Sequence, residues 1–149
     1  MTVNSVWLWG GGRRPAVPGR HFSSVWSDEA LPCALAAHAG LPAAPLPANA
    51  GHWLRAIDSA SSHHLIVLGQ LAAAAQYGNM ARWREEITAL ERDWFAPLLA
   101  TLRRRRISRL TLAVAGHRSS ERFEVTPADL LKFWRSGKPL PAYRPPRNN

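Results

Sequence analysis

The chain has 149 residues, of which 46% are apolar, so a single domain with a packed core is expected. Only 19% of the residues are charged, which excludes wholesale disorder and a long charged coiled coil, and no apolar run reaches the ~20 residues that a membrane-spanning helix needs. The net charge is +9, but 17 of the 19 basic residues are Arg, so compositional bias explains the charge as readily as a selected binding surface does.

The cysteine content and the first residues indicate a compartment. Residues 1–12 carry no basic region ahead of their apolar stretch, which a secretory signal would have. Cys33 is the only cysteine, so an internal disulfide and a multi-cysteine zinc site are both excluded. We therefore expect a cytoplasmic protein that does not associate with a membrane.

The N-terminal third predicts two strands and a helix. Residues 3–9 form a nearly continuous apolar run that ends in three glycines, which is typical of a buried strand, and residues 24–26 suggest a second strand. A helix is expected to begin near Ser27 and to end at Gly40, with Pro32 in its first turn. Leu31, Leu35 and Ala39 would form its apolar face.

The middle of the chain predicts an extended connection, a short helix and a third strand. Residues 41–51 are rich in Pro and Ala and should be extended, whereas residues 52–60 suggest a short helix that holds Trp53 and Ile57. Residues 63–69 are the third candidate strand, and most of them are apolar.

A long amphipathic helix is predicted from about Asn79 to Arg105. Large apolar residues recur there at spacings of three or four and define one face, namely Trp83, Ile87, Leu90, Trp94, Leu98 and Leu102. Pro97 should kink this helix or split it after Asp93, because proline supplies no N–H to the carbonyl four residues back.

The C-terminal third predicts a hairpin, a helix and a tail. Residues 110–115 and 122–125 alternate between apolar and polar across a polar turn, which favours two antiparallel strands. Thr126, Pro127 and Asp129 are typical of a helix start, and the helix would carry Leu130, Leu131, Phe133 and Trp134. Residues 136–149 are rich in Pro and Arg and should be irregular.

Strands and helices alternate along the chain, and the early strands are not amphipathic. This order predicts an α/β fold with a mostly parallel sheet, flanking helices and the antiparallel hairpin at one edge. Residues 1–135 would form one domain, and residues 136–149 a tail.

Two patterns suggest binding sites, each with a plainer interpretation. Arg13 and Arg14 follow a glycine turn of the kind that binds anions, but the glycine spacing fits no nucleotide-binding fingerprint and a simple strand exit is favoured. The run 103–106 is four arginines at the end of the long helix, where cations are favoured by the helix dipole. A solvated helix end is the preferred interpretation, and contact with nucleic acid or an acidic partner is the alternative.

The six histidines show no metal-binding spacing. His63 and His64 are adjacent, so in a strand they point to opposite faces, and the other four have no ligand-type residue at a suitable distance in the sequence. Structural or solvated roles are expected for all six.

Several segments together resemble a known enzyme family. They are NSVWLWGGGRRPAVP (residues 4–18), the segment 25–47, the strand 64–69, DWFAPLL in the long helix and SGKPLP (residues 136–141). In this order they resemble the C-terminal half of the archaeal-type cofactor-independent phosphoglycerate mutases, of the alkaline-phosphatase-like superfamily. The WLWGGGR and DWFAPLL segments are most similar to a proteobacterial branch labelled as pathogenicity-factor regulatory proteins. The resemblance implies an alkaline-phosphatase-like half-fold.

The resemblance also shows where this chain departs from the enzymes, which use two divalent metals and a serine nucleophile. Residues 70–78 contain neither the Asp nor the His of the family, and Gly116 precedes His117 where the family has Asp before His. Arg135 and Lys138 stand where the family has His and Asp. His117 is the only retained ligand-type residue, and one imidazole without carboxylates is a poor site for Mn²⁺ or Mg²⁺.

These departures predict a non-catalytic regulatory or interaction protein without a metal or other cofactor. Arg135 and Lys138, with Arg13 and Arg14, would hold an anion by charge. The partner would be another protein, or the N-terminal half that the enzymes have and this sequence does not. Two alternatives remain: residual phosphoglycerate mutase or phosphatase activity that needs the missing half, and a basic nucleic-acid-binding module.

Overall fold

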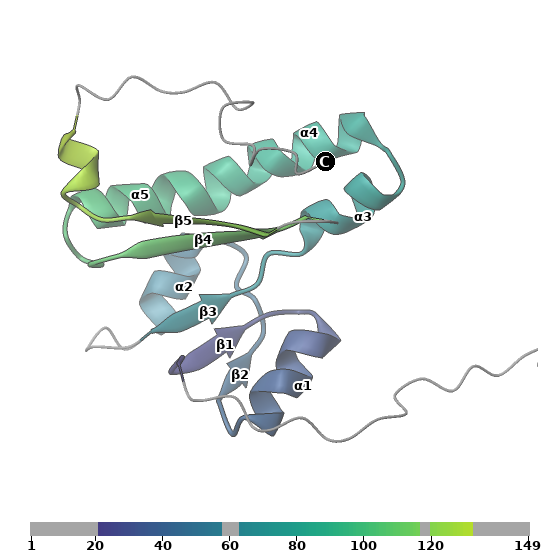
Figure 1. Cartoon of the computed structure of the whole chain (residues 1–149), viewed down its shortest axis with the longest axis horizontal. Coiled ribbons are helices and arrows are strands. Elements are labelled where there is room, and N and C mark those ends of the chain that lie inside the picture. The colour runs from purple at the N-terminus through teal and green to yellow at the C-terminus, as the bar shows by residue number, and fades with distance from the viewer. Residues whose placement is uncertain (1–20, 58–62, 117–119, 133–149) are drawn as a thin grey trace, which may run out of the picture.

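The computed structural model describes residues 21–57, 63–116 and 120–132, and the statements below concern that part of the chain. Figure 1 shows a small sheet with a helix on each side, a long helix above it and a separate hairpin. The elements in chain order are β1 (Ser24–Trp26), α1 (Ala30–His38), β2 (Ala43–Ala44), α2 (Ala50–Ala56), β3 (His64–Ile66), α3 (Gln70–Gln76), α4 (Met80–Leu90), the π-helical turn η1 (Glu91–Phe95), α5 (Ala96–Arg103), β4 (Leu110–Ala115), β5 (Ser120–Val125) and the 3₁₀ turn η2 (Asp129–Leu131).

The parallel sheet that the sequence predicts is confirmed in this part of the chain. Its strand order is β2-β1-β3, and Val25 at its centre is level with Ala43 on one side and Leu65 on the other. The connections pass through α1 and α2, as parallel pairing requires. The predicted strand of residues 3–9, and the boundary at residue 135, lie outside the described residues.

One cluster of buried side chains joins the sheet to the long helix. Its buried members come from α2 and from the long helix and are Ala50, Trp53, Leu90, Trp94 and Leu98. Trp26 of β1 and Ile66 of β3 pack against this cluster, so one face of the sheet is covered by α2 and the long helix. Val25 is buried and alternates with Trp26, which places its side chain on the opposite face, the side of α1.

The long helix is confirmed almost to its predicted limits. It begins after Asn79, whose side chain accepts a hydrogen bond from the Arg82 N–H at 3.0 Å, and α5 ends at Arg103. Leu90, Trp94, Leu98 and Leu102 of the predicted face are all buried, whereas Trp83 and Ile87 are half-buried. No helix among the described residues is long and apolar enough to cross a membrane.

Pro97 does not break the helix, because a π-helical turn precedes it. The Ala96 N–H donates to the Glu91 carbonyl, five residues back, and Pro97 occupies the first turn of α5, where no N–H is needed. The wider turn also serves the core. In an α-helix, a side chain four residues further on is rotated about 40° beyond one full turn around the helix axis. The wider π turn reduces this rotation between Leu90 and Leu98, so their side chains stay on one face.

Two expectations about the strands need correction. The hairpin forms, with Leu110 opposite Val125 and Ala115 opposite Ser120, but it is a separate two-stranded sheet rather than an edge of the parallel sheet. Its strands pair locally, and the sequence pattern carries no information on which sheet they join. Residues 41–51 are not all extended, because they include β2 and the start of α2.

The other corrections concern helix faces and ends. Leu31 and Leu35 are 68% and 50% exposed, because α1 packs through the small side chains of Ala36, and Ala39 beyond its end. The helix predicted after Thr126 is only the 3₁₀ turn η2 within the described residues.

The C-terminal end of α5 places an arginine in a left-handed conformation. Arg105 has φ 55°, the Arg105 N–H bonds the Leu102 carbonyl and the Arg106 N–H bonds the Thr101 carbonyl. These two bonds form a Schellman cap, whose left-handed position is usually glycine because a Cβ there is crowded. Arg105 therefore costs the fold stability that a glycine would not.

We predict that Arg105→Gly is more stable than Arg105→Ala by about 1 kcal/mol. Both variants lose the same charge and the same side-chain contacts, so the comparison isolates the backbone conformation. Chemical unfolding at neutral pH measures the difference. Equal stabilities would show that Arg105 is not left-handed in solution.

Candidate functional site

The residues that the sequence predicts for anion binding lie outside the part that the structure describes. They are Arg13, Arg14, Arg135 and Lys138, and the retained ligand-type residue His117 lies outside it as well. The candidate surfaces below are therefore built from other residues.

A polar network joins the first residues of β1 and β3. The Ser24 hydroxyl is 2.7 Å from His64 Nδ1, and the Trp26 indole N–H donates to the Ser24 oxygen at 2.9 Å. The Trp53 ring meets the His64 ring edge to face, with centroids 5.6 Å apart. Partial burial lowers the pKa of His64, and the neighbouring His63 lowers it further. The lowered pKa favours the neutral form of the His64 imidazole.

This network supports the structural role expected for His64. Within the described ranges, no group of three or more His, Cys, Asp or Glu side chains is placed to hold a metal ion.

A hollow of about 300 Å³ lies at the carboxyl ends of the parallel strands. Asp28 and Glu29 after β1 line it, together with Gly69 and Gln70 after β3, and Leu46 and Val67 complete it. The strand order reverses between β1 and β3, and such a switch point is where open α/β sheets bind ligands. The hollow is therefore a candidate site defined by topology.

The carboxylates of this hollow are partly held by the backbone. Asp28 accepts a hydrogen bond from the Leu46 N–H at 2.9 Å, and Glu29 lies so close to Gly69 that a side chain at position 69 would displace it. Asp28 and Glu29 directly follow Ser27, where the sequence predicts a helix start. Their position directly after a strand was the signal for an edge site. Gln70, directly after the third strand, lines the same hollow.

The β4–β5 hairpin has one apolar and one polar face. Cross-strand register and alternation put Leu110, Leu112, Val114, Phe123 and Val125 on the mostly apolar face, which also carries Glu121 opposite Val114. Leu110 packs against the central cluster, but Leu112, Val114 and Phe123 are 38%, 47% and 36% exposed. This combination of apolar character and exposure was not expected, because the sequence predicted the hairpin as an edge of a sheet with flanking helices.

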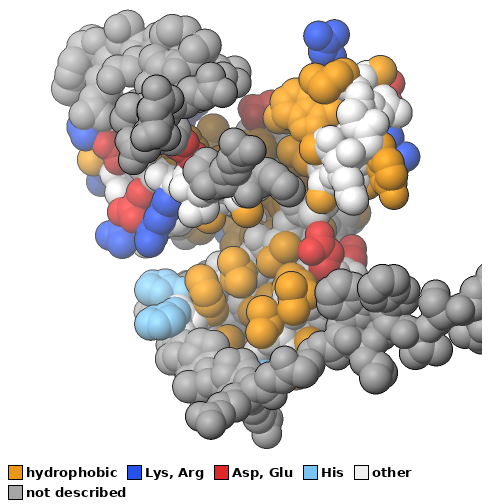
Figure 2. Space-filling view, turned by 45° about the vertical axis from the view of Figure 1, so that its right-hand side comes forward, with side chains coloured by type: hydrophobic (Ala, Val, Ile, Leu, Met, Phe, Trp, Pro, Cys, Tyr) orange, Lys and Arg blue, Asp and Glu red, His pale blue; other side chains and the backbone are white. Residues whose placement is uncertain are grey.

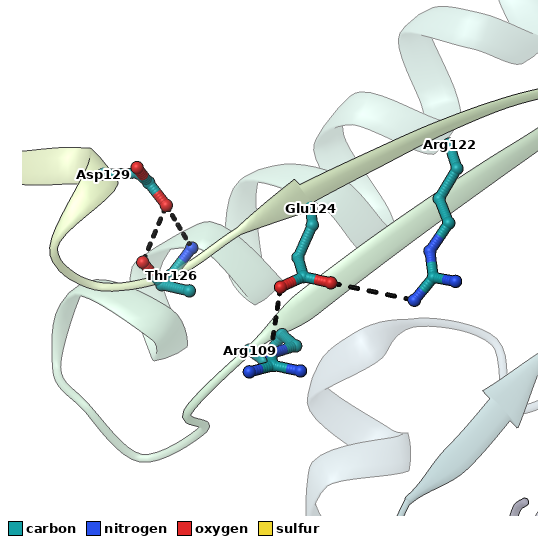
Figure 3. Close-up of polar contacts among 5 residues, drawn as sticks. All are labelled: Arg109, Arg122, Glu124, Thr126 and Asp129. Atoms are coloured by element: carbon teal, nitrogen blue, oxygen red, sulfur yellow. Dashed lines mark hydrogen bonds and ion pairs between the residues drawn. The ribbon is translucent and has the colours of Figure 1, made fainter.

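The polar face carries ion pairs along β5. Glu124 lies 3.2 Å from Arg109 and 3.7 Å from Arg122, so two guanidinium groups share one carboxylate on this face (Figure 3). All three side chains are well exposed, and such pairs contribute little stability. They do give the hairpin a charged face opposite its apolar one.

Apolar side chains of the described residues gather in parts of the molecular surface. In Figure 2 hydrophobic side chains gather in the upper and the lower part of the molecule, and the lower area is bordered by histidines on one side and acidic side chains on another. Tyr77 and Met80, at the corner between α3 and α4, are 82% and 59% exposed. Apolar surface of this kind is typical of contact with other protein segments.

The turn after β5 is held by Asp129, as Figure 3 shows. Lys132 Nζ lies 2.6 Å from one carboxylate oxygen, and the Thr126 hydroxyl and N–H donate to the other at 2.7 and 3.1 Å. The bond from Lys132, and then those from Thr126, hold the pKa of Asp129 far below its ordinary value of 3.8. A lowered folded-state pKa means stabilisation that is present above pH 3.8 and is lost as the pH falls below it.

We predict that Asp129→Asn lowers the thermal unfolding midpoint at pH 6 and that this deficit shrinks as the pH is taken below about 4. At low pH the native carboxyl is protonated too, so the two proteins become alike. Thr126→Val should reproduce part of the deficit, since it removes one of the bonds to the carboxylate. A deficit independent of pH would contradict this interpretation.

Comparisons with known proteins add no relative. No known protein family, no curated protein and no solved structure matches this chain. The resemblance to the phosphoglycerate mutases therefore rests on the sequence segments named above.

Proposed function

We propose that this chain is a non-catalytic interaction protein, related to the cofactor-independent phosphoglycerate mutases, that binds a protein partner through the apolar face of its hairpin. The exposure of Leu112, Val114 and Phe123 on one face carries the proposal. Isolated two-stranded hairpins are marginally stable in water, and they gain stability when their apolar face is covered.

The attachment of the hairpin to the rest of the structure also supports a docking role. Among the described residues of the hairpin, Leu110 alone packs against the central cluster, so the hairpin contacts that cluster at the start of β4. A surface held in this way is accessible to a partner without disturbing the core.

The non-catalytic part of the proposal depends on the family resemblance. Residues 70–78 contain neither the Asp nor the His that the enzymes have after this strand, and Mn²⁺ prefers carboxylate ligands. We predict no phosphatase activity on a phosphoglycerate or an aryl phosphate with millimolar Mn²⁺, and no rise in melting temperature with Mn²⁺. Metal-dependent turnover, or a concentration-dependent thermal shift, would favour the enzymatic alternative.

The docking face can be tested with polar substitutions. We predict that Val114→Ser and Phe123→Ser each weaken partner binding by roughly tenfold or more, because each removes apolar area from the contact. Both positions are partly exposed, so the fold should tolerate them. Leu131→Ser, at a 62% exposed position outside the hairpin, is the matched control and should bind normally.

The measurement uses the native chain as bait in an extract of its own source, followed by titration with the purified partner. Binding that survives both hairpin substitutions and is lost on changing another surface would place the interface elsewhere. Equal loss with Leu131→Ser would show a non-specific effect.

A nucleic-acid-binding module remains the second candidate, and the strained cap favours it. Residues 103–106 are all exposed, and none forms an ion pair with another described residue. Keeping an arginine at a left-handed position that favours glycine suggests that the guanidinium itself is useful.

For this second candidate, log affinity for a duplex should fall linearly with log salt, with a slope of about −0.9 for each phosphate contacted. Replacing Arg103 and Arg104 by Ala should reduce that slope. Fluorescence anisotropy over a salt series measures both, and binding without salt dependence would dismiss the candidate.

A further inference from the structure

The outer edge of β4 is an unpaired strand edge. Among the described residues, β4 pairs with β5 on one side only, over six successive residue pairs from Leu110–Val125 to Ala115–Ser120. Alternate residues of such a strand turn their N–H and C=O groups outward, where they can pair with another strand.

The two edges of the hairpin are protected to very different degrees. β5 carries Glu121, Arg122 and Glu124, and charged side chains are a usual defence against edge pairing. β4 has the sequence LTLAVA, with no charge, no Pro and no Gly, and the uninterrupted register shows no bulge. The unprotected edge is therefore that of β4.

We infer that two copies of this chain pair antiparallel through β4, forming a four-stranded sheet of order β5-β4-β4-β5 about a two-fold axis. This inference rests on the proposed function, since it makes the hairpin the contact region, and it names a second copy as the occupant of the edge.

Charge decides the direction of pairing. A parallel arrangement would set Arg109, directly before β4, beside the Arg109 of the other copy, and like charges opposite each other are unfavourable. The antiparallel arrangement separates the two Arg109 side chains, since each lies near the far end of the other β4. With a net charge of +9 on each copy, a neutral strand is the most favourable place for two copies to meet.

Symmetry limits the register further. Directly opposite residues of an antiparallel pair share a face, so a two-fold axis at the middle of β4 sets either Leu112 or Ala113 opposite its own copy. In both registers the apolar faces of the two hairpins lie on the same side of the joined sheet. The dimer would thus present twice the apolar surface of one hairpin to the partner of the proposed function.

The test introduces a negative charge on β4 that is favourable within one hairpin and unfavourable between two paired copies. Ala113 lies opposite Arg122 within the hairpin, so Ala113→Glu gains a favourable cross-strand neighbour. Across the two-fold axis the new carboxylate approaches its own copy and repels it. Ser120→Glu is the matched control, because it adds the same charge to the same face on β5, away from the paired edge.

Sedimentation equilibrium of the full chain measures the outcome. We expect the native protein and Ser120→Glu to have twice the 16.5 kDa chain mass, and Ala113→Glu to dissociate with a Kd at least tenfold higher. Circular dichroism confirms that Ala113→Glu keeps the native content of secondary structure. A native chain that is monomeric at roughly 100 μM, or a dimer that Ala113→Glu leaves unchanged, overturns the inference.

The two proposals fail separately. A monomer that still binds its partner through Val114 and Phe123 overturns the dimer and keeps the proposed function. A dimer that is broken by Ala113→Glu, but that binds no protein through its apolar face, keeps the inferred dimer and overturns the proposed function.

Discussion

The packing of Trp94 into the cluster around Trp53 holds the described part of this chain together. Trp94 sits in the π turn of the long helix, Trp53 in α2, and the cluster they share is what Trp26 and Ile66 of the sheet pack against. Without that contact the long helix would lose its packing against α2, and the sheet would have one uncovered face. The position of the hairpin depends on it as well, because Leu110 packs on the same cluster.

The dependence on one cluster implies an uneven distribution of stability. Elements with several buried members, such as the long helix, should open only with global unfolding, whereas the hairpin beyond Leu110 has few buried contacts and should open locally at lower free energy. A binding surface on the less stable element is consistent with recognition that is coupled to ordering. The hollow at the carboxyl ends of the strands lies instead at β1 and β3, and both strands pack against the buried cluster.

The sequence predicted those features that local patterns determine. The face of the long helix followed from apolar spacing, and the hairpin from alternation around a polar turn. The parallel sheet followed from the order of elements. Sequence patterns could not predict that the hairpin stands apart or that Leu31 and Leu35 face outward, since both depend on which surfaces meet in three dimensions. The hollow was missed for the same reason, because Asp28 and Gln70 are far apart in the sequence.

The hydrogen bond between Ser24 and His64 has a consequence for how the small sheet is aligned. β1 and β3 are only three residues long, so backbone pairing alone gives a weak preference for one alignment over a slipped one. A hydroxyl that meets one particular ring nitrogen, and that is itself held by Trp26, exists in only one of those alignments. The hydrogen bonds among Ser24, His64 and Trp26 therefore select one register for these two short strands. They also set the position of the carboxylates after β1 relative to Gln70.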